Sequence, residues 1–156
     1  MPTFNSLEEL FDALPGAIDR GLRRAAEGIG QAVEQRAATR LGTYSGNDWP
    51  ELEASTQAER TRLGFSPNDP LRRTGALAES IQHAVDPIAG GYKTVVGSNE
   101  PQARIQELGG VNAGSWGQNG AKDLPPRPYL APSLVESEDA IQQAVALSIA
   151  REIGNL

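Results

Sequence analysis

Apolar residues recur every three or four positions along two long stretches of the chain, which is the spacing of an amphipathic helix. In the first stretch, roughly 17–41, charged residues lie largely off the apolar face, which consists of Ile18, Leu22, Ala25, Ile29, Val33, Ala37 and Leu41. In the second stretch, roughly 134–153, the recurring apolar residues are Ile141, Val145, Ile149 and Ile153. We therefore expect a long N-terminal helix and a C-terminal helix. We expect the N-terminal helix to pack on its own sheet or on a neighbouring subunit. The two are compatible, because the alanines and glycines of this helix allow close approach.

Helix starts are predicted by three capping boxes, in which a Ser or Thr side chain caps a helix that has Glu three positions later. These are Ser6 to Glu9, Thr56 to Glu59 and Ser133 to Glu136. The first of these helices should end near Pro15, because proline lacks the donor that continues a helix. The second should be closed by Gly64, and the third box should open the C-terminal helix.

The middle of the chain predicts a β-hairpin. Residues 92–98 are the clearest predicted strand, and residues 88–91 read as a turn that would pair it with the preceding segment. Thr74 can cap a helix that carries Leu77 inward, but from Ile81 the pattern fits either that helix or a strand that ends at Pro87. The expected fold class is α+β, a small antiparallel sheet packed against the long N-terminal helix and the C-terminal helix. We expect one domain over 1–156.

A flexible loop is expected near 109–126, after a short helix over 101–108 that Gly109 and Gly110 would end. Residues 111–123 are rich in Gly, Asn and Ser and contain a single aromatic residue, Trp116. Such a composition cannot build a core of its own. Either this loop is mobile and becomes ordered on assembly with Trp116 as its anchor, or Trp116 packs back on its own domain.

An extended arm follows this loop, with the sequence Leu-Pro-Pro-Arg-Pro-Tyr over 124–129. Prolines fix their φ angles and push the preceding residue to an extended conformation, so the arm should be stiff. Arg and Tyr are favoured as interface anchors, which makes Arg127, Pro128 and Tyr129 candidate interface residues. Glu107 is a candidate partner for Arg127. The plainer alternative is a local turn that only starts the next helix.

Charge and composition exclude several kinds of function. The net charge is −6, spread evenly along the chain, so no region is basic enough for tight DNA binding. There is no cysteine, no apolar run that would span a membrane and no signal-like N-terminus. The single histidine, His83, has no metal-ligand or nucleophile motif around it, and no phosphate-binding glycine loop is present. We therefore expect no enzyme activity and no cofactor or metal.

Four segments, in order, resemble the phage virion-morphogenesis family of neck or tail-completion proteins. They are Asp48-Trp49-Pro50-Glu51-Leu52 with Ser55-Thr56, then Leu71 with Thr74-Gly75-Ala76-Leu77 and Ser80-Ile81, then Val95-Val96-Gly97-Ser98 leading to Ala103 through Gly109, and finally Pro126-Arg127-Pro128-Tyr129-Leu130. The resemblance covers about residues 48–150 and depends on the order and spacing of these motifs. Gln102 is a departure, since the family usually has an aromatic residue there.

The resemblance implies a structural role at the phage head–tail junction, as a ring of copies between the head connector and the tail tube. Implied partners are head connector or adaptor proteins and tail terminator or tail tube proteins. DNA would pass through the lumen without sequence-specific binding, and an acidic lumen that repels phosphate suits such passage. The protein would lie in the virion after assembly in the host cytoplasm, without contact to a membrane. The alternatives are a monomeric adaptor or decoration protein, or a small hydrolase.

Overall fold

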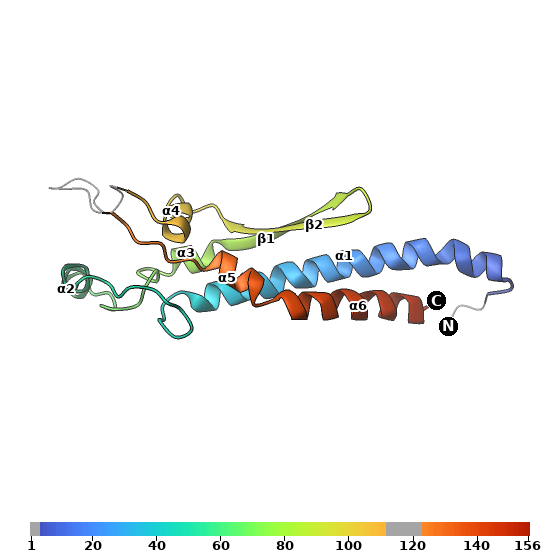
Figure 1. Ribbon diagram of the computed structural model, residues 1–156, viewed down its shortest axis with the longest axis horizontal. Coiled ribbons are helices and arrows are strands. Elements are labelled where there is room, and N and C mark those ends of the chain that lie inside the picture. Colours follow the sequence, from blue (N-terminus) through green and yellow to red (C-terminus); the bar gives the residue numbers. More distant parts are fainter. Residues whose placement is uncertain (1–3, 112–122) are drawn as a thin grey trace. The chain divides into compact units, whose positions relative to one another are not determined.

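The computed structural model describes residues 4–111 and 123–156, which form helices and one two-stranded antiparallel sheet (Figure 1). The α+β class is thus confirmed, with a long N-terminal helix and a C-terminal helix. The elements in chain order are α1 (Leu7–Arg40), α2 (Ala54–Arg62), α3 (Ala76–Glu79), β1 (Ile81–Ile88), β2 (Gly91–Ser98), α4 (Ala103–Leu108), α5 (Leu130–Val135) and α6 (Glu138–Gly154).

The chain divides into two compact units. Unit 1 comprises Met1–Val33, His83–Val96 and Leu134–Leu156, and therefore holds most of α1, the outer part of the hairpin and α6. Unit 2 comprises Glu34–Gln82 and Gly97–Ser133, with α2, α3, α4 and the proline arm. That the whole chain is one domain stays a prediction of the sequence.

The N-terminal helix begins as predicted but does not end at Pro15. Ser6 Oγ accepts a hydrogen bond from the Glu9 N–H (3.2 Å), and the Glu9 carboxylate accepts one from the Asn5 N–H (2.8 Å). The helix then continues through Pro15 to Arg40. A proline removes one backbone donor and introduces a kink, but the hydrogen bonds on either side of it still hold the helix.

Within unit 1, α1 runs between the hairpin and α6 (Figure 1) and contacts both through small residues. A Cβ atom added to Gly21 would lie 2.8 Å from the Cα of Ile149 in α6, and one added to Gly30 would overlap the His83 ring of β1. Thr94 Oγ1 of β2 donates to the Ala26 carbonyl (3.1 Å). The absence of a side chain at Gly21 and Gly30 therefore lets α6 and the hairpin approach α1 closely.

The prediction of which residues form the apolar face of α1 is partly wrong. Ala25 and Val33 are buried as expected, but Ile18 is 39% exposed, and the adjacent Ala17 is buried in its place. At Gly21 the backbone of α6 comes close to α1, and at Gly30 the His83 ring does, so these contacts leave no room for a long side chain.

The predicted C-terminal helix consists of two helices, α5 and α6, and does not start with a cap at Ser133. Ser133 lies inside α5 and is fully buried. On α6, Ile141, Val145 and Ile149 are half-buried on the side that carries the buried Glu152, whereas Ile153 is 40% exposed.

An ion-pair cluster joins α1 and α6 in unit 1. Arg20 Nε lies 3.0 Å from Glu152 Oε2, and Arg24 contacts the other carboxylate oxygen. The hydrogen bond from Arg20 is the largest influence on the pKa of Glu152, and with the nearby positive charges it lowers that pKa despite burial. The cluster therefore favours the ionised carboxylate.

The hairpin prediction is confirmed, and the ambiguity at Ile81 resolves in favour of a strand. Helix α3 ends at Glu79, and Ile81 opens β1 with its side chain buried. In unit 2, α2 begins at Ala54 and not at Thr56, and the side chain of Glu53 at the cap position accepts no capping hydrogen bond from the helix backbone. Gly64 follows α2 with a positive φ of 80°, as expected of a helix-ending glycine.

Candidate functional site

The proline arm is pinned at its beginning. Leu124 pairs with Gly110 through two backbone hydrogen bonds of 2.8 and 3.0 Å. Gly109 immediately precedes Gly110 and has a φ of +73°. A Cβ atom at position 109 would lie 2.9 Å from the Leu124 carbonyl oxygen. Position 109 therefore requires glycine both for its backbone conformation and for the close approach of the arm.

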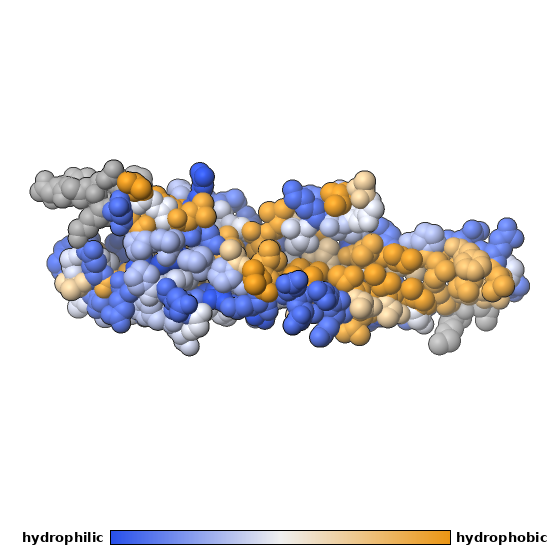
Figure 2. All heavy atoms as spheres, viewed as in Figure 1, coloured by the Kyte–Doolittle hydropathy of each residue, from blue (hydrophilic) through white to orange (hydrophobic). Residues whose placement is uncertain are grey.

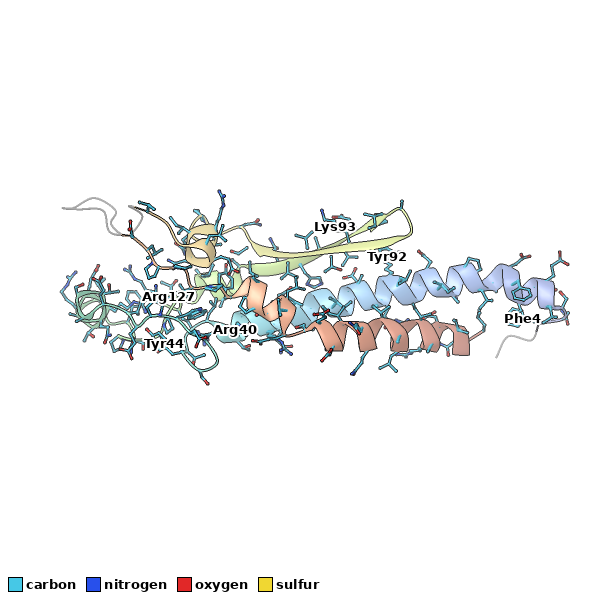
Figure 3. The ribbon with its side chains drawn as sticks, in the orientation of Figure 1. Phe4, Arg40, Tyr44, Tyr92, Lys93 and Arg127 are labelled. Carbon is cyan, nitrogen blue, oxygen red and sulfur yellow. The ribbon has the colours of Figure 1, made fainter. Side chains whose placement is uncertain are left out.

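Arg127 is the central anchor of the arm. Its backbone N–H donates to the Gln106 carbonyl (2.7 Å), and its guanidinium donates to the Pro50 carbonyl (2.9 Å). The side chain is only 5% exposed, and burial lowers the pKa of the guanidinium. Figure 3 places Arg127 in the same part of unit 2 as Arg40 and Tyr44. The arm is thus held by contacts within unit 2.

Glu107 has a different role from the predicted ion pair with Arg127. Its Oε2 accepts hydrogen bonds from the Tyr129 and Leu130 N–H groups (2.7 and 3.0 Å), and its Oε1 accepts from the Ala131 N–H (2.9 Å). These are the unpaired donors at the start of α5. A carboxylate from α4 therefore caps α5, and its negative charge is favourable at a helix N-terminus.

Tyr129 is fully buried beside this cap. Burial is the main cause that raises the pKa of its hydroxyl to about 12, and the Glu107 charge adds to it. Among the described residues, no hydrogen-bond partner is found for the Tyr129 hydroxyl, Arg127 Nε or Gln106 Oε1, all of which are buried. Tyr129 therefore serves unit 2 mainly by the apolar area of its ring.

Two further contacts fix the arm and α5. The Pro128 carbonyl accepts from Trp49 Nε1 (3.2 Å), and Pro128 itself is half-buried. Ser133 Oγ donates to the Tyr129 carbonyl (2.6 Å) and accepts from Arg40 Nε (3.1 Å). The roles of Trp49, Arg40 and Glu107 were missed from the sequence, because their partners lie 22 or more positions away.

The structure thus brings Arg127, Pro128 and Tyr129 together, with the two large side chains buried inside unit 2. Their participation in an interface stays a prediction. Trp116 and most of the predicted flexible loop lie outside the described residues.

His83 is engaged in a structural contact. Its Nε2 lies 3.5 Å from a Glu27 carboxylate oxygen, and its ring fills the space above Gly30. Within residues 4–111 and 123–156, no group of three or more His, Asp or Glu side chains is placed to hold a metal ion. No helix in these ranges is both long and apolar enough to cross a membrane.

Unit 1 has the main exposed apolar surface. It contains nine of the twelve large apolar side chains that are exposed among the described residues, including Leu7, Phe11 and Leu147. Figure 2 shows apolar side chains gathered along α6 and the N-terminal part of α1. Contiguous apolar surface of this kind marks protein interaction sites.

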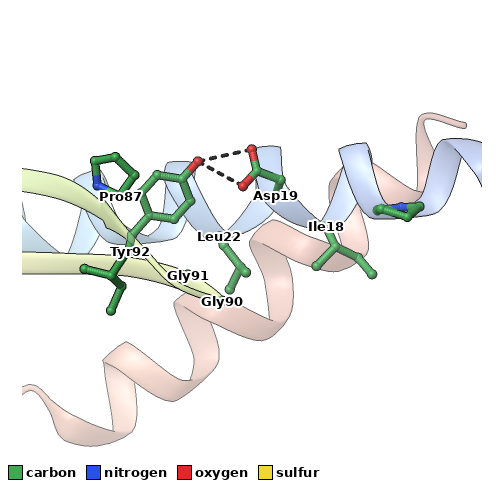
Figure 4. Close-up of a pocket in the computed structure, with 9 residues that line it drawn as sticks. Ile18, Asp19, Leu22, Pro87, Gly90, Gly91 and Tyr92 are labelled. Carbon is green, nitrogen blue, oxygen red and sulfur yellow. Dashed lines mark hydrogen bonds between the residues drawn. The ribbon is translucent and has the colours of Figure 1, made fainter.

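An apolar groove of about 440 Å³ forms part of this surface, between α1 and the tip of the hairpin (Figure 4). Its apolar walls are Pro15, Ile18, Leu22, Pro87, Ile88 and Tyr92. Asp19 lies at its edge and accepts hydrogen bonds from the Tyr92 hydroxyl at 3.0 and 3.1 Å. Burial, followed by this hydrogen bond, raises the pKa of Tyr92.

The sequence model of the phage virion morphogenesis family matches residues 3–150, nearly the whole chain. The protein therefore belongs to that family and is a structural or assembly protein of a phage virion. No curated protein and no solved structure matches it significantly.

Proposed function

We propose that this protein is a neck or tail-completion protein of the phage head–tail junction, where its copies form a ring between the head connector and the tail tube. The proposal rests on membership of the virion morphogenesis family. The observation that carries it is the exposed apolar surface of unit 1, which is gathered along α6 and the N-terminal part of α1 (Figure 2). A protein that works inside an assembly covers such a surface with its neighbours.

Charge supports the same role. Unit 1 has ten acidic and five basic side chains, a net charge of −5, and the whole chain has −6. A surface of this sign repels the phosphates of passing DNA, so the genome slides through the ring without sequence-specific binding. The role is structural and not enzymatic.

The partners follow from this position. One side of the ring contacts a head connector or adaptor protein, and the other contacts a tail terminator or tail tube protein. The protein is assembled in the host cytoplasm and remains in the virion at the junction.

The test is an in vitro joining assay. Heads and tails from a phage that lacks this gene are mixed with the purified protein, and joined particles are counted by electron microscopy. Native mass spectrometry of the same preparation measures the oligomeric state. Joined particles together with a closed oligomer support the proposal. Normal joining by a protein that stays monomeric at every stage indicates an adaptor, and no effect on joining contradicts the proposed function.

A further inference from the structure

The groove of unit 1 combines exposed apolar walls with a carboxylate at its edge. Ile18 and Ile88 on its walls are 39% and 54% exposed, so an apolar group that enters the groove would cover them. Asp19 lies at its edge, and Asp12, two helical turns earlier in α1, lies on the same helix face. Both carboxylates are on exposed residues.

The described part of the chain offers three exposed leucines with an arginine within one helical turn. Leu63 lies next to Arg60 and Arg62 at the end of α2, Leu108 follows Arg104 in α4, and Leu147 precedes Arg151 in α6. Leu63 has two arginines within one turn, against one for each of the other two leucines, and Glu59 is its acidic neighbour in α2. Arg73 stacks over the ring of Phe65 at 5.0 Å, and Arg60 binds the Asp69 carbonyl, which ties the segment before Arg73 to α2. We call the residues Arg60, Arg62, Leu63, Phe65 and Arg73 the basic cluster.

Helix α2 leaves most of its residues exposed. It has nine residues, and none of them is buried. A helix of this length is marginal in water, since most helical stability in proteins comes from packing. In addition, burial and then the positive charge of Arg73 lower the pKa of Arg60, although Asp69 already offsets part of this effect. Carboxylates from a partner would relieve this repulsion between like charges.

Net charge also disfavours a contact between the unit 1 surfaces of two copies. Two such units each have a net charge of −5, and Leu147 belongs to this acidic unit. Complementary potentials favour association, whereas like charges oppose it. The basic cluster lies in unit 2, whose net charge is only −1.

We propose that the groove on unit 1 of one copy binds the basic cluster of a second copy, with Leu63 inserted between Ile18 and Ile88 and Arg62 beside the carboxylates of α1. Such a contact joins two different surfaces and is therefore heterologous, the type that builds rings or filaments. The inference rests on the proposed ring and names its subunit interface.

Because the chain contains no cysteine, single-cysteine variants provide a direct test. Ile88→Cys protein is mixed with Leu63→Cys protein at a concentration where the wild type is oligomeric, and a short bis-maleimide reagent is added. Both substitutions fall on exposed side chains, and circular dichroism checks that both variants are folded. We expect a crosslinked heterodimer of the two variants, with little product from either variant alone. The matched control replaces Leu63→Cys by Leu147→Cys, an exposed leucine that also has a nearby arginine.

A crosslink of Ile88→Cys that is equally strong with Leu147→Cys, or absent with Leu63→Cys, overturns the inference. A wild-type chain that stays monomeric at every concentration overturns it as well. Charge reversal adds a second readout. We expect Arg62→Glu to weaken self-association about tenfold, equivalent to 1.4 kcal/mol, and Arg151→Glu to leave it unchanged. If the crosslink fails while the protein still joins heads to tails, the proposed function stands and the ring uses another surface.

Discussion

Unit 1 and unit 2 bury different kinds of side chain. In the described part of unit 1, the fully buried apolar residues are three alanines and a valine, at positions 17, 25, 26 and 33. Unit 2 buries Leu41, Trp49, Leu77, Ile81 and Tyr129 together with two small alanines. Unit 1 is held by close backbone contacts and an ion-pair cluster, and unit 2 by large side chains and a dense set of hydrogen bonds.

The difference indicates a division of tasks. Apolar burial contributes roughly 25 cal/mol per Å², so alanines and glycines add little stability, and the larger side chains of unit 1 remain available to partners. Unit 2 encloses its aromatic residues and so holds the proline arm in one conformation without help from a second copy. We therefore expect substitutions of the buried side chains of unit 2 to act on folding, and substitutions of the exposed apolar side chains of unit 1 to act on assembly.

The largest effect is expected for Tyr129→Ala. Removing a fully buried ring leaves a cavity, which typically lowers the free energy of unfolding by about 3–5 kcal/mol. The midpoint of urea denaturation, followed by circular dichroism, measures this loss. Tyr129→Phe is the matched control and should retain or slightly raise the stability, because the hydroxyl is buried without a partner in the described structure. Equal losses for both variants would contradict the role assigned to the ring.

Glu107→Ala should have the next largest effect. It removes the acceptor of three N–H groups at the start of α5, and hydrogen bonds to a charged group contribute about 1.5–3 kcal/mol. We expect a loss near 3 kcal/mol in the free energy of unfolding. Glu107→Gln keeps one acceptor oxygen and should fall between wild type and Glu107→Ala. Amide hydrogen exchange should be accelerated at Tyr129, Leu130 and Ala131, and unchanged protection there would sink the capping role.

Gly21→Ala tests how unit 1 is packed. The new methyl group would lie 2.8 Å from the Cα of Ile149, a backbone atom that cannot move without displacing α6. Overpacking of this kind typically costs about 1–3 kcal/mol. Gly28→Ala in the same helix meets nothing within 4 Å and should instead stabilise α1, by up to about 1 kcal/mol. Thermal melts of the two variants should therefore shift in opposite directions.

The smallest effect is expected from pH. The pKa of Glu152 in the folded chain lies below its ordinary value of 4.5, mainly because of the hydrogen bond from Arg20. Its ion pairs therefore stabilise unit 1 above about pH 4.5, and this contribution is lost as the pH falls through the lowered pKa. Glu152→Gln should be less stable than wild type at neutral pH, with a difference that narrows towards pH 3. A difference between Glu152→Gln and wild type that stays constant from neutral pH to pH 3 would contradict this role of the ion pairs.

Much of the secondary structure follows from the sequence, because it depends on neighbours along the chain. The step of three or four apolar positions predicts α1 and α6, alternation and a glycine turn predict the hairpin, and Gly64 marks the end of α2. The family was also recognisable from the order of short motifs. The sequence located the proline arm as well, since three prolines fix the backbone wherever they occur.

Tertiary structure decided the roles that depend on residues far apart in the chain. Ser133 resembles a helix cap, but it lies inside α5, and Glu107 from α4 caps the start of that helix. Arg127 binds the Pro50 carbonyl, a partner 77 positions away that no local pattern indicates. Gly21 and Gly30 look like weak points of a helix, yet α6 and the hairpin approach α1 closely at these two positions. Local sequence determines which element forms, whereas the choice of partner depends on three-dimensional packing.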